Sequence, residues 1–191
     1  YDIVCSDLKE LKIHDGAKQL ISSFRFIPLD ILRPSLHEQY NAVTAFSLLY
    51  LFDKDDLNHF FENVSNSLNI GGNLVLDPGG ASDSRMTLFM DEFLLKYETL
   101  IKRIILFVLG KPSASVVKHH GFRRSDHEII VAAKEAGFEL VATEYGDSFT
   151  ELGRSWVLQC LLGAGGFVSK AFSVVGRKMP YVRLFLFKRI A

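Results

Sequence analysis

FRFIPLDIL (residues 24–32) and YNAVTAFSLLYLF (residues 40–52) are the two stretches that decide the predicted fold. Each contains a short apolar run rich in β-branched or aromatic residues, which predicts a β-strand. Each also carries a polar side chain beside that run, Asp30 in the first stretch and Ser47 in the second. Ligands of an open α/β sheet bind just beyond the carboxyl ends of its strands. The two stretches therefore predict a nucleotide-like ligand at that edge.

Strands and helices alternate around these two stretches. The strands expected in the first half are residues 1–5, 24–29, 42–46 and 73–76. A helix at residues 9–23 separates the first two strands. A second helix begins at a cap, Asp53 or Asp55, and ends at Gly71-Gly72. Its apolar residues recur at helical spacing, at Leu57, Phe60, Phe61, Val64 and Leu68. This alternation predicts right-handed crossovers and a largely parallel sheet.

The second half begins with a longer helical pattern. Apolar residues keep helical spacing from 84 to 109, and Gly110 and Pro112 end the pattern. Ser125 and Glu128 form a capping box that opens a helix ending at Gly137. We expect strands at 139–145 and 181–188 and a helix at 156–175, with Arg183 breaking the apolar run of the last strand. These elements predict one domain over residues 1–191, with helical inserts at about 84–121 and 150–178.

The helix at 84–109 is hydrophobic on more than one face toward its end. Its final turns read IILFVL, residues 104–109. We interpret the insert as a lid over an apolar acceptor pocket, packed on the region of Trp156. Two alternatives stay open. One is a membrane-surface contact with Lys96, Lys102 and Arg103 near the lipid headgroups, and the other is a dimer contact.

Composition narrows the classes of protein and partner. A chain of 191 residues suits one domain with a sizeable core, and 48% apolar residues with 16 Phe argue against disorder. Lysine plus arginine and aspartate plus glutamate number 22 each, so no net charge attracts nucleic acid. Cys5 and Cys160 lie far apart in apolar runs, which favours buried reduced thiols and excludes a zinc site built mainly from cysteine. We expect no metal site.

Membrane and export signals do not stand out in the sequence. The chain shows no signal-peptide pattern, and no apolar run reaches the roughly 18 residues that span a bilayer. We therefore expect a cytoplasmic protein without an integral membrane segment.

Several segments, taken in order, resemble the motifs of one known family. Residues 1–8 look like a strand and the turn whose acidic residue holds ribose hydroxyls, and Leu29-Asp30-Ile31 resembles the segment that meets adenine. Residues 45–50 look like the motif beside the methionine and methyl group, and residues 68–76 resemble a Gly-Gly turn into the fifth strand. With two closing antiparallel strands, this order resembles the class I S-adenosylmethionine-dependent methyltransferases. The resemblance covers residues 1–80, 122–145 and 180–190.

The resemblance implies a Rossmann-like three-layer sandwich whose sheet is mostly parallel, with an antiparallel last strand. The family's glycine-rich first loop is absent from this chain, together with the first strand and helix. That strand lies centrally in the family's sheet, between the second and fourth strands, which here correspond to residues 1–5 and 42–46. Removing it would leave two inner edges unpaired, which proteins avoid. We therefore expect the missing unit upstream of Tyr1 in the natural protein.

The resemblance also implies a cofactor site for S-adenosylmethionine. Asp7 would accept hydrogen bonds from the ribose hydroxyls, and Leu8 would pack on the adenine face. The residues implied for the adenine are Asp30 and Ile31, and those for the methionine and the methyl path are Ser47 and Tyr50. Simpler roles stay open: a helix cap for Asp7, a cap or a loop contact with Arg33 for Asp30, and ordinary core packing for Ile31.

Methyl transfer to a protonated acceptor requires a base. His119 and His120 are the candidates because they lie in an expected loop and histidine titrates near neutral pH. The alternative is that both are solvated loop residues or make structural hydrogen bonds.

The function that we expect is methyl transfer to a small apolar or aromatic acceptor. One alternative is a non-catalytic, methyltransferase-like module that binds a partner or a membrane surface. A second alternative is an NAD(P)-dependent oxidoreductase, which shares the sheet and the acidic residue after a strand. This second alternative assigns no role to residues 47–52 or to the Gly71-Gly72 turn.

Overall fold

The computed structural model describes residues 2–7, 23–28, 30–33, 39–46, 48–79, 81–89, 95–110, 121–145 and 183–191. The strands among them are β1 (Asp2–Asp7), β2 (Ser23–Pro28), β3 (Tyr40–Phe46), β4 (Leu68–Asp77), β5 (Phe138–Tyr145) and β6 (Arg183–Arg189). The helices are the 3₁₀ helix η1 (Leu49–Leu51), α2 (Lys54–Ser67), α3 (Arg85–Leu88), α4 (Leu95–Val108) and α5 (Asp126–Glu135).

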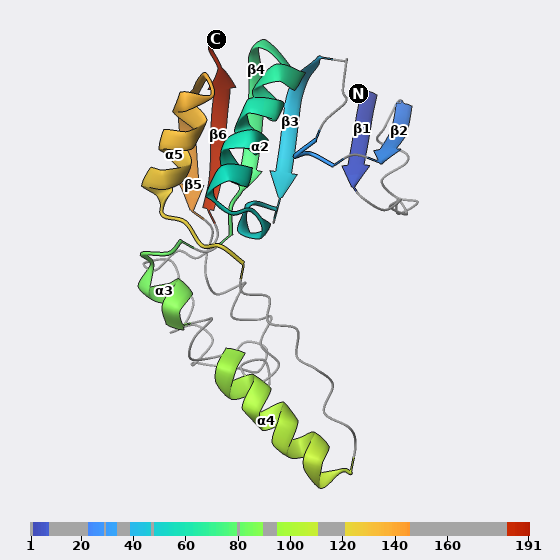
Figure 1. The fold of residues 1–191 in the computed structure, drawn as a ribbon, viewed down its shortest axis with the longest axis vertical. Coiled ribbons are helices and arrows are strands. Elements are labelled where there is room, and N and C mark those ends of the chain that lie inside the picture. The colour runs from blue at the N-terminus through green and yellow to red at the C-terminus, as the bar shows by residue number, and fades with distance from the viewer. Residues whose placement is uncertain are drawn as a thin grey trace, which may run out of the picture.

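The described strands form a two-stranded sheet, β1-β2, and a four-stranded sheet in the order β3-β4-β6-β5. β1 pairs with β2 in parallel and β3 pairs with β4 in parallel, whereas β6 is antiparallel to both of its neighbours. The predicted parallel sheet with a closing antiparallel strand is therefore confirmed. Figure 1 shows that β1, β2, β3 and β4 all point their carboxyl ends toward the same edge.

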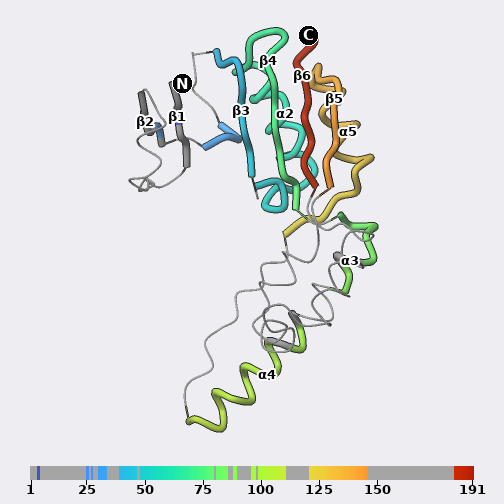
Figure 2. Tube along the Cα trace, turned by 180° about the vertical axis from the view of Figure 1, so that it is seen from behind, coloured from blue at the N-terminus to red at the C-terminus, as the bar shows by residue number. Residues whose placement is uncertain are grey.

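The two sheets lie side by side, and their facing edges are not paired. Figures 1 and 2 both show the β1-β2 pair beyond β3, on the side of the sheet away from β4. Among the described strands, β1 pairs only with β2, and β3 pairs only with β4. This interruption falls at the position where the resemblance places the family's first strand.

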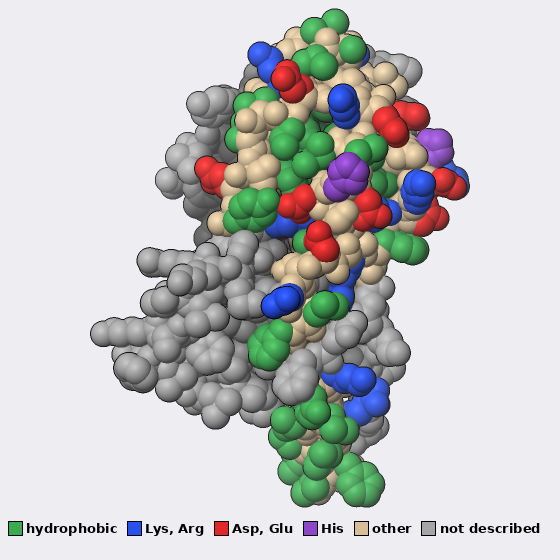
Figure 3. Space-filling model, turned by 90° about the vertical axis from the view of Figure 1, so that its left-hand side faces the viewer, with side chains coloured by type: hydrophobic (Ala, Val, Ile, Leu, Met, Phe, Trp, Pro, Cys, Tyr) green, Lys and Arg blue, Asp and Glu red, His purple; other side chains and the backbone are tan. Residues whose placement is uncertain are grey.

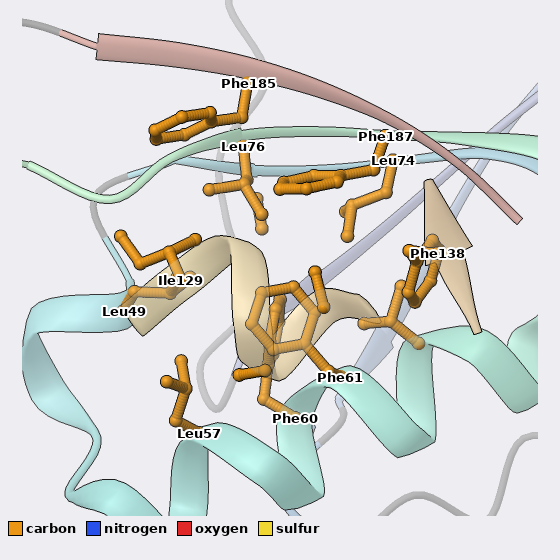
Figure 4. Close-up of a cluster of buried hydrophobic side chains, with 14 of the residues drawn as sticks. Leu49, Leu57, Phe60, Phe61, Leu74, Leu76, Ile129, Phe138, Phe185 and Phe187 are labelled. Atoms are coloured by element: carbon orange, nitrogen blue, oxygen red, sulfur yellow. The ribbon is translucent and has the colours of Figure 1, made fainter. Parts of the chain in front are cut away.

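The core lies between the four-stranded sheet and the helices α2 and α5, which cover the same face in Figures 1 and 2. The strand register sets Leu74 opposite Phe187 and Leu76 opposite Phe185, so these four side chains share that face. Phe61 of α2 meets them, with its ring centroid 6.2 Å from that of Phe187 in an edge-to-face arrangement (Figure 4). The predicted apolar face of α2 is buried as expected, at Leu57, Phe60, Phe61 and Val64.

The prediction that Gly71-Gly72 ends the second helix was wrong. α2 ends at Ser67, and β4 begins at the next residue, Leu68. The two glycines lie inside β4, where the pairing with β3 shifts between Tyr40 and Ala42. Gly71 has φ +83° there, and a Cβ on Gly72 would lie 2.8 Å from a backbone oxygen. The glycines therefore serve an irregularity of the strand, not a helix end.

The other predicted helix boundaries follow local sequence signals. Asp53 caps α2 by accepting the Asp56 backbone N–H at 2.9 Å, and the Ser125–Glu128 capping box opens α5. Gly110 follows α4 with a positive φ, as its predicted stop requires. The pattern at 84–109 is helical in α3 and α4, while residues 90–94 are not among those described. The helix expected at 9–23 lies outside the described ranges except at Ser23, which begins β2 and is therefore not helical. The helix expected at 156–175, with Trp156 and Cys160, also lies outside these ranges.

Stability should depend on pH through the Glu128 carboxylate. Hydrogen bonds from the Ser125 backbone N–H (2.7 Å) and then from its hydroxyl hold the pKa of Glu128 below its ordinary value. A depressed pKa contributes stability above the unfolded-state pKa of about 4.3. That contribution is lost as the pH falls through the lower folded-state pKa. We expect Glu128→Gln to unfold at lower urea than wild type at pH 7, and the difference to shrink once the pH falls below about 4.3. A difference that stays constant as the pH is lowered through this region would contradict this assignment.

Candidate functional site

Two acidic residues lie at neighbouring strand ends. Asp7 is the last residue of β1, and the parallel register pairs it with Pro28, the last residue of β2. Asp30 follows two residues later. The backbone thus brings both positions to the carboxyl edge of the β1-β2 pair, as the sequence predicts. The side chain of Asp7 and the whole of Leu8 lie outside the part of the chain that the structure describes.

Asp30 is exposed and shapes a tight turn. Its Oδ1 accepts the Leu32 backbone N–H at 3.1 Å, and its carbonyl oxygen accepts the Arg33 backbone N–H at 2.9 Å. The turn alternative of the sequence prediction is therefore present. A carboxylate has two oxygens, each able to accept more than one hydrogen bond, so the turn and a ligand contact are compatible.

α2 holds this turn against the larger sheet. The Asn63 side-chain amide donates to the Ile31 carbonyl oxygen at 2.9 Å, and Ile31 and Leu32 are half-buried against the core. Asn63 was not among the residues predicted from the sequence. The sequence of α2 gave no signal for it, because Asn63 is one of three asparagines in that helix. The contact connects the end of β2 with the four-stranded sheet, so it fixes the position of Asp30.

The segment after β3 forms the second part of the edge. Tyr50 is half-buried in η1, and its carbonyl oxygen accepts the Phe122 backbone N–H at 2.6 Å. The chain approaches so closely that a Cβ on Gly121 would lie 1.8 Å from the Tyr50 oxygen. Gly121 directly follows His119 and His120 in the sequence. Those histidines and Ser47 are not among the residues described.

A buried arginine fixes the turn that contains Tyr50. Arg124 donates to the carbonyl oxygens of Leu49, at 3.4 Å, and Phe52, at 2.8 Å. Burial lowers the pKa of Arg124, and the negative charges of Glu128 and Asp53 oppose that shift. An arginine remains charged under such a shift. Its fork of donors therefore adds a second hydrogen bond to the Leu49 carbonyl oxygen, which also accepts the Phe52 N–H, and binds the carbonyl oxygen at the end of η1.

A second buried arginine joins the loop after β4 to the same region. Arg183 donates to the carbonyl oxygens of Gly79, at 3.0 Å, and Arg124, at 3.3 Å, and it forms an ion pair with Asp126. The Tyr145 hydroxyl donates to the other oxygen of Asp126 at 2.9 Å, which together with partial burial raises the pKa of Tyr145. We call Arg124 and Arg183 the arginine brace.

The arginine brace connects the chain after β3, the chain after β4, the start of α5 and the start of β6. A short parallel bridge between Ala81 and Arg124 adds to this connection. From the sequence, Arg183 was predicted only to break an apolar run. The signal that was missed is that a charged residue in a buried strand requires partners, which a linear sequence does not identify.

The described residues show neither a metal cluster nor a membrane-spanning helix. Among the described side chains, no group of three or more His, Cys, Asp or Glu residues is placed to hold a metal ion. Within these ranges, no helix has both the length and the apolar character needed to cross a bilayer.

No protein-family model and no curated protein matches the sequence. Solved structures do match the fold. The chain is similar to an S-adenosylmethionine-dependent methyltransferase from Clostridium acetobutylicum, with TM-score 0.56 and 13% identity, over 100% of this chain and 76% of the other. It is also similar to a putative sarcosine dimethylglycine methyltransferase from Galdieria sulphuraria, with TM-score 0.55 and 11% identity, over 98% of this chain and 69% of the other.

A third similar structure is geranyl diphosphate C-methyltransferase from Streptomyces coelicolor, whose crystals contain Mg²⁺, geranyl diphosphate and S-adenosyl-L-homocysteine. The TM-score is 0.50 and the identity 14%, over 91% of this chain and 57% of the other. This chain therefore spans between 57% and 76% of the lengths of these three proteins. The chain has the class I S-adenosylmethionine-dependent methyltransferase fold, which confirms the fold that the sequence predicts.

Proposed function

We propose that this chain forms most of a domain that binds S-adenosylmethionine and transfers its methyl group to a small molecule. The observation that carries the proposal is the shared edge where Asp7, the Asp30 turn and η1 follow the ends of β1, β2 and β3 (Figure 1). In an open α/β sheet this edge is the ligand site. The fold shared with solved methyltransferases supports the same assignment.

The proposed contacts fall on three parts of the cofactor, which are the ribose, the adenine and the methionine. Asp7 accepts hydrogen bonds from the ribose hydroxyls, and Leu8 packs on the adenine. Asp30 is suited to the adenine, because its exposed carboxylate can still accept a hydrogen bond from an exocyclic amine. Ile31 borders the adenine beside it. Ser47 and Tyr50 border the methionine and the methyl path. Phe122 donates its N–H to the Tyr50 carbonyl oxygen there, and Arg124 binds the neighbouring Leu49 carbonyl oxygen.

The bound cofactor supplies an activated methyl group, and the chain supplies alignment and a proton acceptor. Alignment of the acceptor, the methyl carbon and the sulfur accounts for most of what such a transfer needs from a protein. His119 and His120, which adjoin Gly121 in the sequence, are the proposed bases for a protonated acceptor. An apolar or aromatic acceptor is proposed from the exposed apolar surface of α4.

Isothermal titration of the whole chain with S-adenosylhomocysteine tests the cofactor site. We expect saturable binding that Asp7→Ala and Asp30→Ala each weaken by about tenfold to 100-fold, because each removes hydrogen bonds to a charged acceptor. Asp55→Ala, an exposed carboxylate on α2, is the matched control and should leave binding unchanged. Equal loss in all three variants, or binding that neither Asp7→Ala nor Asp30→Ala weakens, would refute the site.

Two further measurements, methyl transfer from S-adenosylmethionine and titration with NAD(P), distinguish the alternatives. Binding of S-adenosylhomocysteine without methyl transfer to any acceptor tested would favour the non-catalytic module. Binding of NAD(P) in its place would favour the oxidoreductase.

A further inference from the structure

The last residues of β3 and β4 place an aromatic ring beside a carboxylate. The parallel register pairs Phe46 with Asp77, and neighbouring strands of a sheet lie about 4.8 Å apart. Ala45 and Leu76, the residues before them, are buried on the face that α2 and α5 cover (Figures 1 and 2). Because side chains alternate along a strand, Phe46 and Asp77 both lie on the opposite face. They are therefore neighbours at the carboxyl edge of the sheet.

Phe46 is exposed at the edge where the cofactor is proposed to bind. Its exposed fraction is 57%. Many of the other exposed apolar side chains belong to α4, at one extremity of the molecule (Figure 3). Phe46 is separate from that group, because it directly precedes Ser47 and the turn that contains Tyr50. Its ring is therefore placed to contact a ligand of the carboxyl edge.

The Asp77 carboxylate is held in place and keeps one oxygen available. Its Oδ1 accepts the Gly79 backbone N–H at 2.8 Å, and Arg183 donates to the Gly79 carbonyl oxygen at 3.0 Å. Among the described residues, Oδ2 of Asp77 has no hydrogen-bond partner, and Arg183 forms its ion pair with Asp126 instead. Asp77 is also half-buried. Its Oδ2 can accept a hydrogen bond from a ligand without disturbing the turn.

Other carboxylates of the described loops already have partners. Asp53 and Glu128 cap helices, and both oxygens of Asp126 accept hydrogen bonds, from Arg183 and Tyr145. The half-buried charge at the end of β4 is stabilised most by a positively charged donor. An aromatic ring beside it adds to this preference, because the face of the ring attracts cations. The pair therefore favours a cation over a neutral ligand.

We propose that Phe46 and Asp77 bind an ammonium group of the methyl acceptor. Oδ2 of Asp77 accepts a hydrogen bond from the ammonium group, and the Phe46 ring contacts the same end of the molecule. The acceptor class is then an amine with an apolar or aromatic body. This proposal rests on the proposed methyl transfer for the role of the ligand. Asp77 is a binding residue in it, and the proton acceptors remain His119 and His120.

Titration of the whole 191-residue chain with phenethylamine tests the amine site. The neutral comparison is 2-phenylethanol, in which a hydroxyl group replaces the ammonium group. Ligand-observed NMR measures both dissociation constants, with and without S-adenosylhomocysteine. We expect phenethylamine to bind about tenfold more tightly than 2-phenylethanol, because hydrogen bonds between charged groups are the stronger ones.

Asp77→Asn keeps an oxygen for the Gly79 N–H and removes the negative charge. We expect it to weaken phenethylamine binding about tenfold and to change 2-phenylethanol binding by less than about twofold. Phe46→Leu keeps an apolar contact without the aromatic face, and it should weaken phenethylamine binding about threefold. The matched control is Asp83→Asn, an exposed carboxylate in the loop after β4 that should leave binding unchanged. Thermal melts should confirm that all variants are folded.

Three results would each overturn the proposal: no binding of phenethylamine, equal binding of the two probes, or equal loss in Asp77→Asn and Asp83→Asn. The cofactor site is tested separately, because Asp77→Asn should bind S-adenosylhomocysteine like wild type. Binding of S-adenosylhomocysteine without a preference for the amine would refute this proposal alone. Amine binding that depends on Asp77, in a chain that does not bind S-adenosylhomocysteine, would support the amine site but not the proposed function.

Discussion

Gly121→Ala is expected to destabilise the protein by about 3 kcal/mol, at the upper end of overpacking costs. The added Cβ would lie 1.8 Å from the Tyr50 carbonyl oxygen and 2.6 Å from both its carbonyl carbon and its ring atom Cδ2. The end of a long side chain can avoid such a clash by changing its rotamer, but backbone atoms cannot. One of the two segments must therefore move and break the hydrogen bond between Phe122 and Tyr50.

Urea unfolding of Gly121→Ala measures this cost, and Gly79→Ala is its control. Gly79 has φ +81°, but a Cβ added there would meet no atom within 4 Å, so alanine introduces backbone strain without a clash. We expect the control to lose about 1 kcal/mol. If the two variants unfold at the same urea concentration, the close approach of Gly121 to Tyr50 is not a constraint on the fold.

The same variant bears on the proposed cofactor site. Displacement of Tyr50 moves η1, which follows the carboxyl end of β3. We expect Gly121→Ala to bind S-adenosylhomocysteine more weakly under conditions where it remains folded. Gly79→Ala, which changes the loop after β4, provides the comparison.

Local signals in the sequence predicted the parts of the fold that depend on nearby residues. Asp53 and Ser125 each satisfy backbone donors within three positions, so their caps are readable without a structure. The glycines at 71 and 72 were misread for the opposite reason. Their role depends on pairing with β3, and the shift between Tyr40 and Ala42 has no signature in the sequence of β4 alone.

The order of segments predicted the candidate site only in outline. Placing Asp30 and Tyr50 beyond strand ends required only the alternation of strands and helices. The groups that hold them in place were missed, because their partners are distant in sequence. Asn63 contacts Ile31 across 32 positions, and Arg124 contacts Leu49 across 75. Such pairs form only when the tertiary fold brings the segments together.

The arginine brace links the last strand to segments that are distant in the sequence. Arg183 begins the last strand, yet its guanidinium contacts the loop after β4 and the start of α5. The closing strand therefore does more than complete the sheet. It holds the carbonyl group of Gly79 and, through Arg124, the turn at Leu49. Substitutions at the start of β6 should therefore displace the backbone at the edge where the cofactor is proposed to bind.

Arg183→Met is expected to cost about 3 kcal/mol of unfolding free energy, the lower end of the range for one member of a buried ion pair. The Arg183 side chain is 3% exposed, so its removal leaves the Gly79 carbonyl oxygen and Asp126 without this donor. The lower end applies because Asp126 retains 32% exposure and water can partly solvate it. Urea unfolding measures the loss, and Lys188→Met, an exposed position on the same strand, should change stability little.

A second substitution separates the ion pair from simple loss of packing. Asp126→Asn removes the charge that Arg183→Met leaves uncompensated, so the double variant should lose less than the sum of the two single variants. Additive losses would show that Asp126 and Arg183 do not interact. Arg183→Lys keeps the charge but lacks the planar fork that reaches two carbonyl groups and a carboxylate together. It should therefore recover only part of the stability. Full recovery would show that only the positive charge at position 183 matters, and not the planar guanidinium.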